Sequence, residues 1–431
     1  MELMNIWNCE KRPLTELLST IIDNRGKTVP TVDNGRILIA TNCVTNNTLF
    51  PVYEKVRFIS DEIYHTWFRG HPTPGDILFV NKGTPGRVCL VPDPIDFSIA
   101  QDMIALRADD TKVYNKYLLA VLRSDRIQRQ IYNTSVGDVI PHFKKQFLNQ
   151  LLIPIPDRKV QEFIGDLYYN LSYKVEHNNR INHNLEAQAQ ALYKSWFVDF
   201  EPFRGGKFVD SELGLIPEGW RVGCYNDIIS STVSGDWGKD REVDNYTHKV
   251  SCIRGCDFAD VSSGIRGKTP ERFVLEKNFQ NKRLLDKDII VEISGGTPTV
   301  STGRICLVSD NLLDKYSGNI VCTNFCRVIR PCSGYSSYVF YSWLDKYKSR
   351  VMFGYENGTS GIKNFQISDF LEKEPVIIPP ETVIAQFQTI VEFYQAVIQR
   401  NGNERMKCET LRDTLLPKLM SGELKISYLT C

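Results

Sequence analysis

Two long stretches of the chain carry apolar residues at the spacing of a coiled coil. In the first stretch, apolar side chains recur at steps of mainly four and three residues between Val160 and Leu192, and in the second they do so between Ile384 and Leu415. This period is typical of a helix that packs against another helix. Because neither helix can bury its apolar stripe alone, we expect the two to pair with each other in antiparallel orientation.

Polar residues interrupt both stripes near their middle. Lys174, Asn178 and Gln188 do so in the first stretch, and Asn401 and Arg405 do so in the second. Polar residues inside a coiled coil more often fix the register than perform chemistry, so we interpret these helices as packing elements. The residues expected to serve in helix packing or partner contact are Leu167, Leu171, Leu185, Leu192, Trp196, Phe197, Phe387, Val391, Tyr394, Leu411 and Leu415.

The remainder of the chain has a different pattern. Short runs rich in β-branched residues, such as Arg36–Ile39, Asp76–Val80 and Asp288–Val291, are separated by Gly, Pro and Asn. Such runs predict strands joined by tight loops. Each region also contains one helical stretch, near residues 115–132 and 336–352. The fold class is therefore predicted to be α+β.

The two halves of the chain repeat each other. Trp7 and Gly83–Pro85 recur 213 residues later as Trp220 and Gly296–Pro298, and further matching pairs follow in the same order. The order of parts is globule, helix, globule, helix. We therefore predict two similar mixed α/β globules separated by two long antiparallel coiled-coil helices, with an internal repeat related by an approximate twofold axis.

Composition and charge restrict the class of protein. The 431 residues are 42% hydrophobic and 24% charged, which is typical of globular proteins and argues against a disordered chain. We find no apolar run near 18 residues and no secretory leader, so we expect no membrane span and place the twelve cysteines as reduced thiols in the cytoplasm. The net charge of +1 is low for a protein that grips DNA alone, so any nucleic-acid binding must come from local patches or be shared with a partner.

The sequence contains none of the catalytic motifs that we sought. A Walker loop, a GxGxxG loop, a [DNS]PP[FYW] methyltransferase loop, HExxH and GxSxG are all absent. The Gly-rich run 295–303 is better interpreted as a hairpin loop than as a phosphate site. A four-cysteine zinc site at Cys252, Cys256, Cys322 and Cys326 stays an alternative, but the spacing favours packing of buried cysteines. A Cys–His catalytic pair also stays open, although nothing singles one out. We assign no catalytic residue and no metal site.

Positive charge is concentrated in two regions. Residues 112–145 contain seven Lys or Arg and two acidic residues, and residues 239–287 contain eleven and eight. Arg123, Arg126 and Arg129 are spaced to make one helix edge cationic. A solvated surface is the alternative, but two separated basic globules suit a two-part DNA target. The candidate DNA-binding residues are Arg25, Lys27, Lys82, Arg87, Arg123, Arg126, Arg129, His142, Lys144, Lys239, Arg241, Arg254, Arg266, Lys268, Arg304 and Lys363.

Three segments resemble a known family. The run LEAQAQALYKSWFVDF at Leu185–Phe200 looks like the end of the central conserved helix in the DNA-specificity subunits of type I restriction–modification enzymes. Leu213–Trp220, LGLIPEGW, resembles the entry to their second target-recognition domain, and Leu411–Leu424, LRDTLLPKLMSGEL, resembles their distal conserved helix. The resemblance covers essentially the whole chain.

This resemblance implies a non-catalytic subunit with four parts. They are a first target-recognition domain at 1–156, a central conserved coiled-coil helix at 157–200, a second target-recognition domain at 201–380, and a distal conserved helix with the C-terminal tail at 381–431. Each recognition domain would read one half of a split site in double-stranded DNA. The helices would act as spacer and as docking surface for methyltransferase subunits, two in number, and for restriction or translocase subunits.

The resemblance also implies where cofactors bind. S-adenosylmethionine, ATP and magnesium would be held by the partner subunits, and no cofactor by this chain. Recognition domains of this family diverge in sequence, so no base-reading residue can be carried over. Two other classes stay open: a duplicated enzyme with one site in each globule, and a scaffold that uses its helices for protein contact alone.

Overall fold

The computed structural model describes residues 5–24, 26–135, 140–297, 299–358 and 363–424. The chain forms two compact units. Unit 1 comprises Met1–His177 with Lys407–Cys431, and unit 2 comprises Asn178–Met406. The long helices α4 (Arg158–Phe197) and α10 (Glu381–Ser421) each contribute residues to both units. The four-part division made from the sequence treats the helices as separate parts, whereas the packing joins a segment of each helix to each globule.

Unit 1 contains two small sheets. One has the strand order β2-β8-β5-β6 and is antiparallel, and the other has the order β4-β3-β7, in which β3 and β7 run parallel. Strand β1 pairs with β9, which immediately precedes α4. The elements are β1 (Lys11–Pro13), β2 (Leu18–Asp23), β3 (Arg36–Ile39), β4 (Arg57–Ile59), α1 (Asp61–Thr66), β5 (Ile77–Val80), β6 (Val88–Leu90), β7 (Phe97–Ile99), β8 (Met103–Ala108), α2 (Asn115–Leu122), α3 (Asp125–Ser135) and β9 (Leu152–Pro154).

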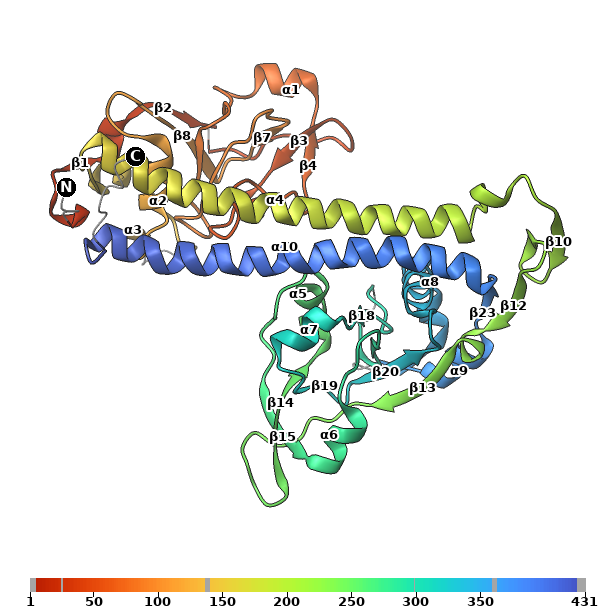
Figure 1. The fold of residues 1–431 in the computed structure, drawn as a ribbon. Coiled ribbons are helices and arrows are strands. Elements are labelled where there is room, and N and C mark those ends of the chain that lie inside the picture. The colour runs from red at the N-terminus through yellow and green to blue at the C-terminus, as the bar shows by residue number, and fades with distance from the viewer. Residues whose placement is uncertain (1–4, 25, 136–139, 298, 359–362, 425–431) are drawn as a thin grey trace, which may run out of the picture. The chain divides into compact units, whose positions relative to one another are not determined.

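Unit 2 repeats this topology with additions. Its sheets have the orders β13-β20-β16-β18 and β15-β14-β19, and β14 and β19 run parallel. Figure 1 labels β13, β18 and β20 of the first sheet and the three strands of the second. Strands β12 and β23 pair as β1 and β9 do, and unit 2 also contains the sheets β10-β11 and β17-β22-β21. The strands are β10 (Phe208–Ser211), β11 (Gly214–Pro217), β12 (Arg221–Cys224), β13 (Ile229–Ser234), β14 (Tyr246–Ile253), β15 (Glu271–Leu275), β16 (Ile289–Glu292), β17 (Ser294–Gly295), β18 (Ile305–Leu307), β19 (Ile320–Cys322), β20 (Cys326–Pro331), β21 (Glu356–Asn357), β22 (Lys363–Phe365) and β23 (Pro375–Ile378). The shorter helices are α5 (Phe258–Ser262), α6 (Glu276–Lys282), α7 (Asp310–Lys315), α8 (Ser336–Lys348) and α9 (Ile367–Lys373).

The equal strand orders confirm the mixed α/β fold class and the internal repeat. The equivalent helices α2 and α8 also form the same hydrogen bond to the strand that precedes each long helix. The Tyr117 hydroxyl of α2 donates to the carbonyl of Pro154 in β9 at 2.8 Å, and the Tyr338 hydroxyl of α8 donates to the carbonyl of Ile377 in β23. Both tyrosines are fully or almost fully buried. Within the described residues, no helix is long and apolar enough to cross a membrane.

In unit 2, α4 and α10 pack in antiparallel orientation through polar as well as apolar contacts. The Asn178 amide donates to the Asn401 carbonyl at 3.3 Å, and the Asn401 amide donates to the Asn182 side-chain oxygen at 2.9 Å. The Asn182 amide in turn donates to the carbonyl of Ile398 at 3.2 Å. Asn178 is only 1% exposed, so the polar interruption seen in the sequence is a buried hydrogen-bond network. Such networks favour one register, because slippage would leave amides unpaired.

The globules approach the helices closely at two glycines. A Cβ atom placed on Gly165 of α4 would lie 2.6 Å from the backbone nitrogen of Tyr117 in unit 1. One placed on Gly402 of α10 would lie 2.2 Å from the backbone oxygen of Gly264 in unit 2. Both distances are shorter than real Cβ contacts, so each globule is seated by backbone against backbone.

Most residues expected in helix packing are indeed buried or half-buried. Phe197, Phe387 and Val391 lie in the core of unit 2, and Trp196 contacts the rings of Phe203 and Phe387 there. Leu192 and Tyr394 border that core, Leu167 and Leu415 border the core of unit 1, and Leu171 and Leu185 are half-buried. Leu411 is 48% exposed, so within the described residues it contributes little to helix packing and its place in partner contact stays a prediction. Its neighbour Arg412 turns toward Tyr168 of α4 instead.

Candidate nucleic-acid interface

The basic helix edge predicted from Arg123, Arg126 and Arg129 does not exist as one helix. Helix α2 ends at Leu122 and α3 begins at Asp125, so Arg123 lies at the break between them. The Ser124 hydroxyl donates to the carbonyl of Val121 at 2.6 Å and closes the end of α2. A side chain that bonds the backbone in this way competes with helix continuation.

Arg123 is half-buried and its guanidinium is bonded within unit 1, so it does not lie with Arg126 and Arg129 on one cationic helix edge, which corrects the sequence-based assignment. Its guanidinium donates to the carbonyls of Thr45, Thr48 and Val88 and, at 2.8 Å, to the hydroxyl of Tyr168. With its donors committed to four acceptors, Arg123 joins a loop, strand β6 and α4. Arg126 and Arg129 are exposed on α3, where the Arg126 guanidinium stacks 4.8 Å from the centre of the Trp7 ring.

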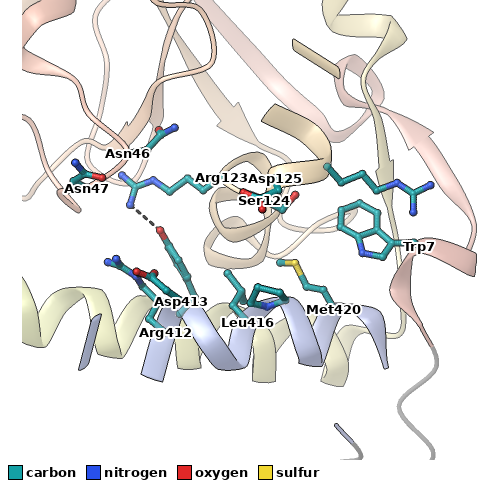
Figure 2. A pocket seen from close by; sticks show the side chains of 13 residues that line it. Trp7, Asn46, Asn47, Arg123, Ser124, Asp125, Arg412, Asp413, Leu416 and Met420 are labelled. Atoms are coloured by element: carbon teal, nitrogen blue, oxygen red, sulfur yellow. Dashed lines mark hydrogen bonds and ion pairs between the residues drawn. The ribbon is translucent and has the colours of Figure 1, made fainter. Parts of the chain in front are cut away.

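A cavity of about 500 Å³ lies in unit 1 beside this break (Figure 2). Arg123 donates to the Tyr168 hydroxyl beside this cavity. Figure 2 shows Arg412 and Asp413 approaching from α10. The cavity offers guanidinium groups, amides and aromatic rings, and none of its thirteen lining residues is His, Cys or Lys. Those residues are Trp7, Asn46, Asn47, Arg123, Ser124, Asp125, Arg126, Tyr168, Arg412, Asp413, Leu416, Pro417 and Met420.

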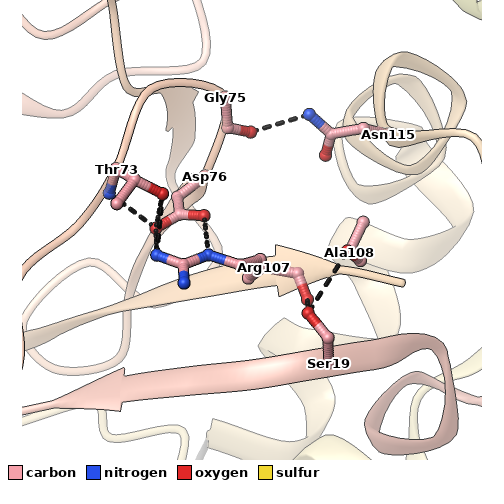
Figure 3. Close-up of polar contacts among 7 residues, drawn as sticks. All are labelled: Ser19, Thr73, Gly75, Asp76, Arg107, Ala108 and Asn115. Atoms are coloured by element: carbon pink, nitrogen blue, oxygen red, sulfur yellow. Dashed lines mark hydrogen bonds and ion pairs between the residues drawn. The ribbon is translucent and has the colours of Figure 1, made fainter. Parts of the chain in front are cut away.

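Both globules are built on the same buried ion pair. In unit 1 the Arg107 guanidinium donates to both oxygens of Asp76 at 2.9 Å, and Asp76 also accepts from the Thr73 backbone nitrogen at 2.8 Å (Figure 3). In unit 2 the Arg330 guanidinium donates to Asp288 at 3.1 Å, and Asp288 accepts from the backbone nitrogen of Leu285 at 2.9 Å. Burial raises the pKa of Asp288, which the bonds from Leu285 and Arg330 oppose.

A repeated set of backbone hydrogen bonds also holds three loops together at one edge of each globule. In unit 1 the Asn81 nitrogen donates to the Asp102 carbonyl at 3.1 Å, and the Asn81 carbonyl accepts from Phe143 at 2.8 Å. In unit 2 the Ile293 nitrogen donates to the Phe325 carbonyl at 2.9 Å, and the Ile293 carbonyl accepts from Phe365 at 2.9 Å. We call residues 81–83, 100–102 and 141–143 the loop edge of unit 1. Residues 293–295, 323–325 and 363–365 form the loop edge of unit 2.

Several predicted DNA-binding residues lie at or near the loop edge of unit 1. Lys82 and His142 pair there as an antiparallel bridge, which fixes the backbone beneath both side chains. Lys82 is exposed, as are Lys144, which follows this edge, and Arg87 in the β5–β6 hairpin. Among the described residues, none of these three cations forms an ion pair, so they can meet phosphate oxygens without breaking an existing pair. Lys27 is exposed on the β2–β3 connection, and Arg25 lies outside the described residues.

The predicted cations near the loop edge of unit 2 are engaged by acidic residues. Arg304 donates to both oxygens of Glu292 at 2.6 and 2.7 Å, and this hydrogen bonding raises the pKa of Arg304. Lys363 pairs with Glu356 at 2.7 Å, and Arg254 pairs with Asp257 at 3.0 Å. These pairs balance the charge of Arg254, Arg304 and Lys363 locally, and the assignment of the three residues to DNA binding stays a prediction.

The remaining basic residues of unit 2 are exposed on connections outside the loop edge. Lys239 and Arg241 lie between β13 and β14, and Arg266 and Lys268 lie between α5 and β15. Lys239 lies over the Tyr246 ring at 5.5 Å, and Arg266 over the Tyr316 ring at 4.8 Å. Their exposure leaves them available to a polyanion.

Charge-based reasoning missed the loop-edge residues that are not basic. Gln101 and Asp102 are half-buried in unit 1, whereas Phe325 of unit 2 is 56% exposed. Phe325 and Trp237 line a second cavity of about 230 Å³. The sequence carries no signal for Phe325, because an isolated aromatic residue between two strand-like runs predicts a buried position.

The cysteines considered as a zinc site do not form a ligand cluster. Cys252, Cys322 and Cys326 are buried, whereas Cys256 is exposed. Burial raises the pKa of the Cys252 thiol to about 12, which disfavours the thiolate that a metal would need. Among the described residues, no group of three or more His, Cys, Asp or Glu side chains is arranged to hold a metal ion.

Comparison with known proteins agrees with this architecture. Residues 27–187 match the model of the type I restriction modification DNA specificity domain. The chain is 27% identical over 362 residues to the type I restriction enzyme MjaIX specificity subunit of Methanocaldococcus jannaschii, covering 82% of this chain and 79% of that protein. It is 22% identical over 414 residues to the HindI specificity subunit of Haemophilus influenzae, covering 81% and 86%.

A solved structure shares the fold. The type I restriction–modification S subunit from M. genitalium superposes with a TM-score of 0.59 at 16% identity, covering 96% of both chains. These matches confirm the resemblance drawn from the sequence: the chain is similar over most of its length to the DNA-specificity subunits of type I restriction–modification enzymes, and residues 27–187 match their DNA specificity domain.

Proposed function

We propose that this chain recognises a bipartite DNA site and directs methyltransferase and restriction subunits to it. Each unit reads one half-site through its loop edge. The observation that carries this proposal is the repeated frame: the same ion pair and the same backbone bonds support loop edges whose side chains differ. Two copies of one scaffold with different surfaces suit two different half-sites.

The charge distribution supports a role in which backbone and base contacts are separated. Exposed cations such as Lys82, Arg87 and Lys144 supply phosphate contacts, which position a protein on DNA without reading sequence. The engaged cations Arg304 and Lys363 keep defined orientations through their carboxylate partners, as base-edge readout requires. The net charge of +1 fits an assembly in which partner subunits add to the grip on DNA.

Chemistry is assigned to the partners in this proposal. Methyltransferase subunits, two in number, and restriction or translocase subunits hold S-adenosylmethionine, ATP and magnesium, and this chain contributes sequence recognition. The helices α4 and α10 carry exposed apolar side chains, among them Phe163, Tyr173 and Phe393, which suit contact with such partners.

The test is methylome sequencing of a strain that expresses the chain with its methyltransferase subunit. We expect one bipartite methylated motif. Replacing residues 1–155 by the corresponding segment of another specificity subunit should change one half of that motif and leave the other half intact.

The matched control replaces residues 201–380 and should change the opposite half. A motif that is continuous, or one in which both halves change with either exchange, contradicts the proposal. A chimaera that assembles with the methyltransferase but methylates nothing is tested for binding to a duplex that carries one half-site from each parental motif, which it must bind in preference to either parental motif.

A further inference from the structure

Phe325 occupies the same place in unit 2 as Asp102 does in unit 1. Each residue presents its backbone carbonyl to the residue that follows the buried strand β16 or β5, through the Ile293 and Asn81 nitrogens. The preceding turn is also equivalent, because Thr323 donates to the Ile253 carbonyl as Ala100 donates to that of Ile39. This equivalence rests on hydrogen bonds and is independent of sequence alignment.

The two side chains at this place have opposite chemistry. Unit 1 offers the half-buried carboxylate of Asp102, which suits a hydrogen bond with a base edge. Unit 2 offers the phenyl ring of Phe325, 56% exposed on its loop. Because a phenyl ring has no hydrogen-bond donor or acceptor, its contact with a base cannot be a hydrogen bond.

The surroundings of Phe325 form a bordered surface. Together with Trp237 it lines the cavity of about 230 Å³, whose other lining residues include Arg254, Glu292 and Thr323. Glu292 is paired with Arg304 and Arg254 with Asp257, so both polar groups of the rim are held in defined orientations. A polar rim of fixed orientation around an exposed ring is what an apolar contact needs in order to be selective for one group.

We infer that Phe325 reads a thymine methyl group in the half-site bound by unit 2. The thymine C5-methyl is the apolar group that the major groove displays, and phenylalanine is among the side chains that contact it. The equivalent base pair in the other half-site is read by the carboxylate of Asp102. This inference rests on the proposed function and adds the chemistry that distinguishes the two half-sites.

The test substitutes uracil for thymine, one position at a time, in duplexes that carry the methylated motif. Uracil pairs like thymine and lacks only the methyl group. The complex of the chain with its methyltransferase subunit should lose about fourfold in affinity at one position of the unit 2 half-site, since one methyl contact is lost. The F325A complex should bind thymine and uracil at that position equally.

Two control variants accompany this measurement. In D102A, which alters the equivalent place in unit 1, the uracil effect should remain. In L285A, which removes another exposed apolar side chain at the opposite end of β16, the effect should also remain. Amide exchange in β19 and β20 verifies that F325A is folded, which its exposed side chain leads us to expect.

The inference is overturned if no position of the unit 2 half-site distinguishes thymine from uracil, or if F325A keeps the distinction. Failure of the proposed function looks different: the complex would then show no bipartite motif at all, and no uracil scan could be designed. If the motif is bipartite but thymine and uracil bind equally at every position, only the assignment of Phe325 is refuted and the proposed function stands.

Discussion

Breaking the buried ion pair of unit 1 should loosen that unit and leave unit 2 unchanged. The change is Arg107→Met, which keeps an apolar stem and removes the guanidinium. Asp76, with a side chain 2% exposed, would lose two of its hydrogen bonds and retain those from Thr73. Its charge would then lie uncompensated in the protein interior.

The expected cost is about 3 kcal/mol. Removing one partner of a buried pair costs roughly 3–5 kcal/mol. Arg107 is 37% exposed, so water partly replaces it and the lower end of the range applies. At about 1.4 kcal/mol for each factor of ten, amides of β5 and β8 should exchange roughly 100-fold faster. The assay is hydrogen exchange followed by mass spectrometry, with β16 and β20 as internal references.

Two further variants decide whether the buried charge is the cause. Asp76→Asn combined with Arg107→Met removes the charge along with its partner, so protection of β5 and β8 should largely return. Arg330→Met should move the effect to β16 and β20, because Asp288 is 3% exposed and holds the equivalent place. If the double variant exchanges as fast as Arg107→Met, or if either single variant loosens both units equally, the reasoning is refuted.

Three other outcomes are expected. Gly165→Ala and Gly402→Ala each place a Cβ within 2.6 Å of backbone atoms, so the urea midpoint of unfolding should fall for unit 1 and unit 2 respectively. The control Gly334→Ala has open space around it and should lower stability only through the strain of its positive φ. Lys82→Ala with Arg87→Ala should lower the salt dependence of DNA binding by about two units of slope, and an unchanged slope would remove both residues from the phosphate contacts. Burial lowers the pKa of Lys315 from 10.5 to about 8, so the folded state releases its proton first and unit 2 gains stability as pH rises from about 8 toward 10.5. Lys315→Met should flatten that rise, and an equal rise in both proteins would assign it to other groups.

The elements that the sequence could predict are those defined by periodicity. The stripe between Val160 and Leu192 predicts a helix because its period is local, and α4 indeed covers this span. The repeat of Gly86-Arg87 as Gly303-Arg304 was visible because glycine is required at both turns, where φ is positive. The repeat did not reveal the ion-pair partners of these arginines. Arg304 is paired with Glu292, whereas the residue equivalent to Glu292 in unit 1 is Val80, which cannot pair with Arg87.

The candidate site was predictable only in part because charge counts ignore where a side chain points. Arg123 is a residue type that commonly contacts phosphate, but here it forms hydrogen bonds within unit 1, because the helix breaks at Ser124 and the side chain points inward. Nor can the sequence distinguish an exposed phenylalanine from a buried one. Phe325 is recognised only through the backbone bond that equates it with Asp102.

The glycine contacts at Gly165 and Gly402 separate attachment from recognition. Because these contacts are made by main-chain atoms, they require only that one helix position lacks a side chain. They do not depend on which residues occupy the distant loops. Substitutions at a loop edge can then accumulate without altering how the globule rests on its helix segment. Under the function proposed above, a chain built in this way would acquire a new DNA preference by changing few residues, while the surface proposed for contact with partner subunits would stay constant.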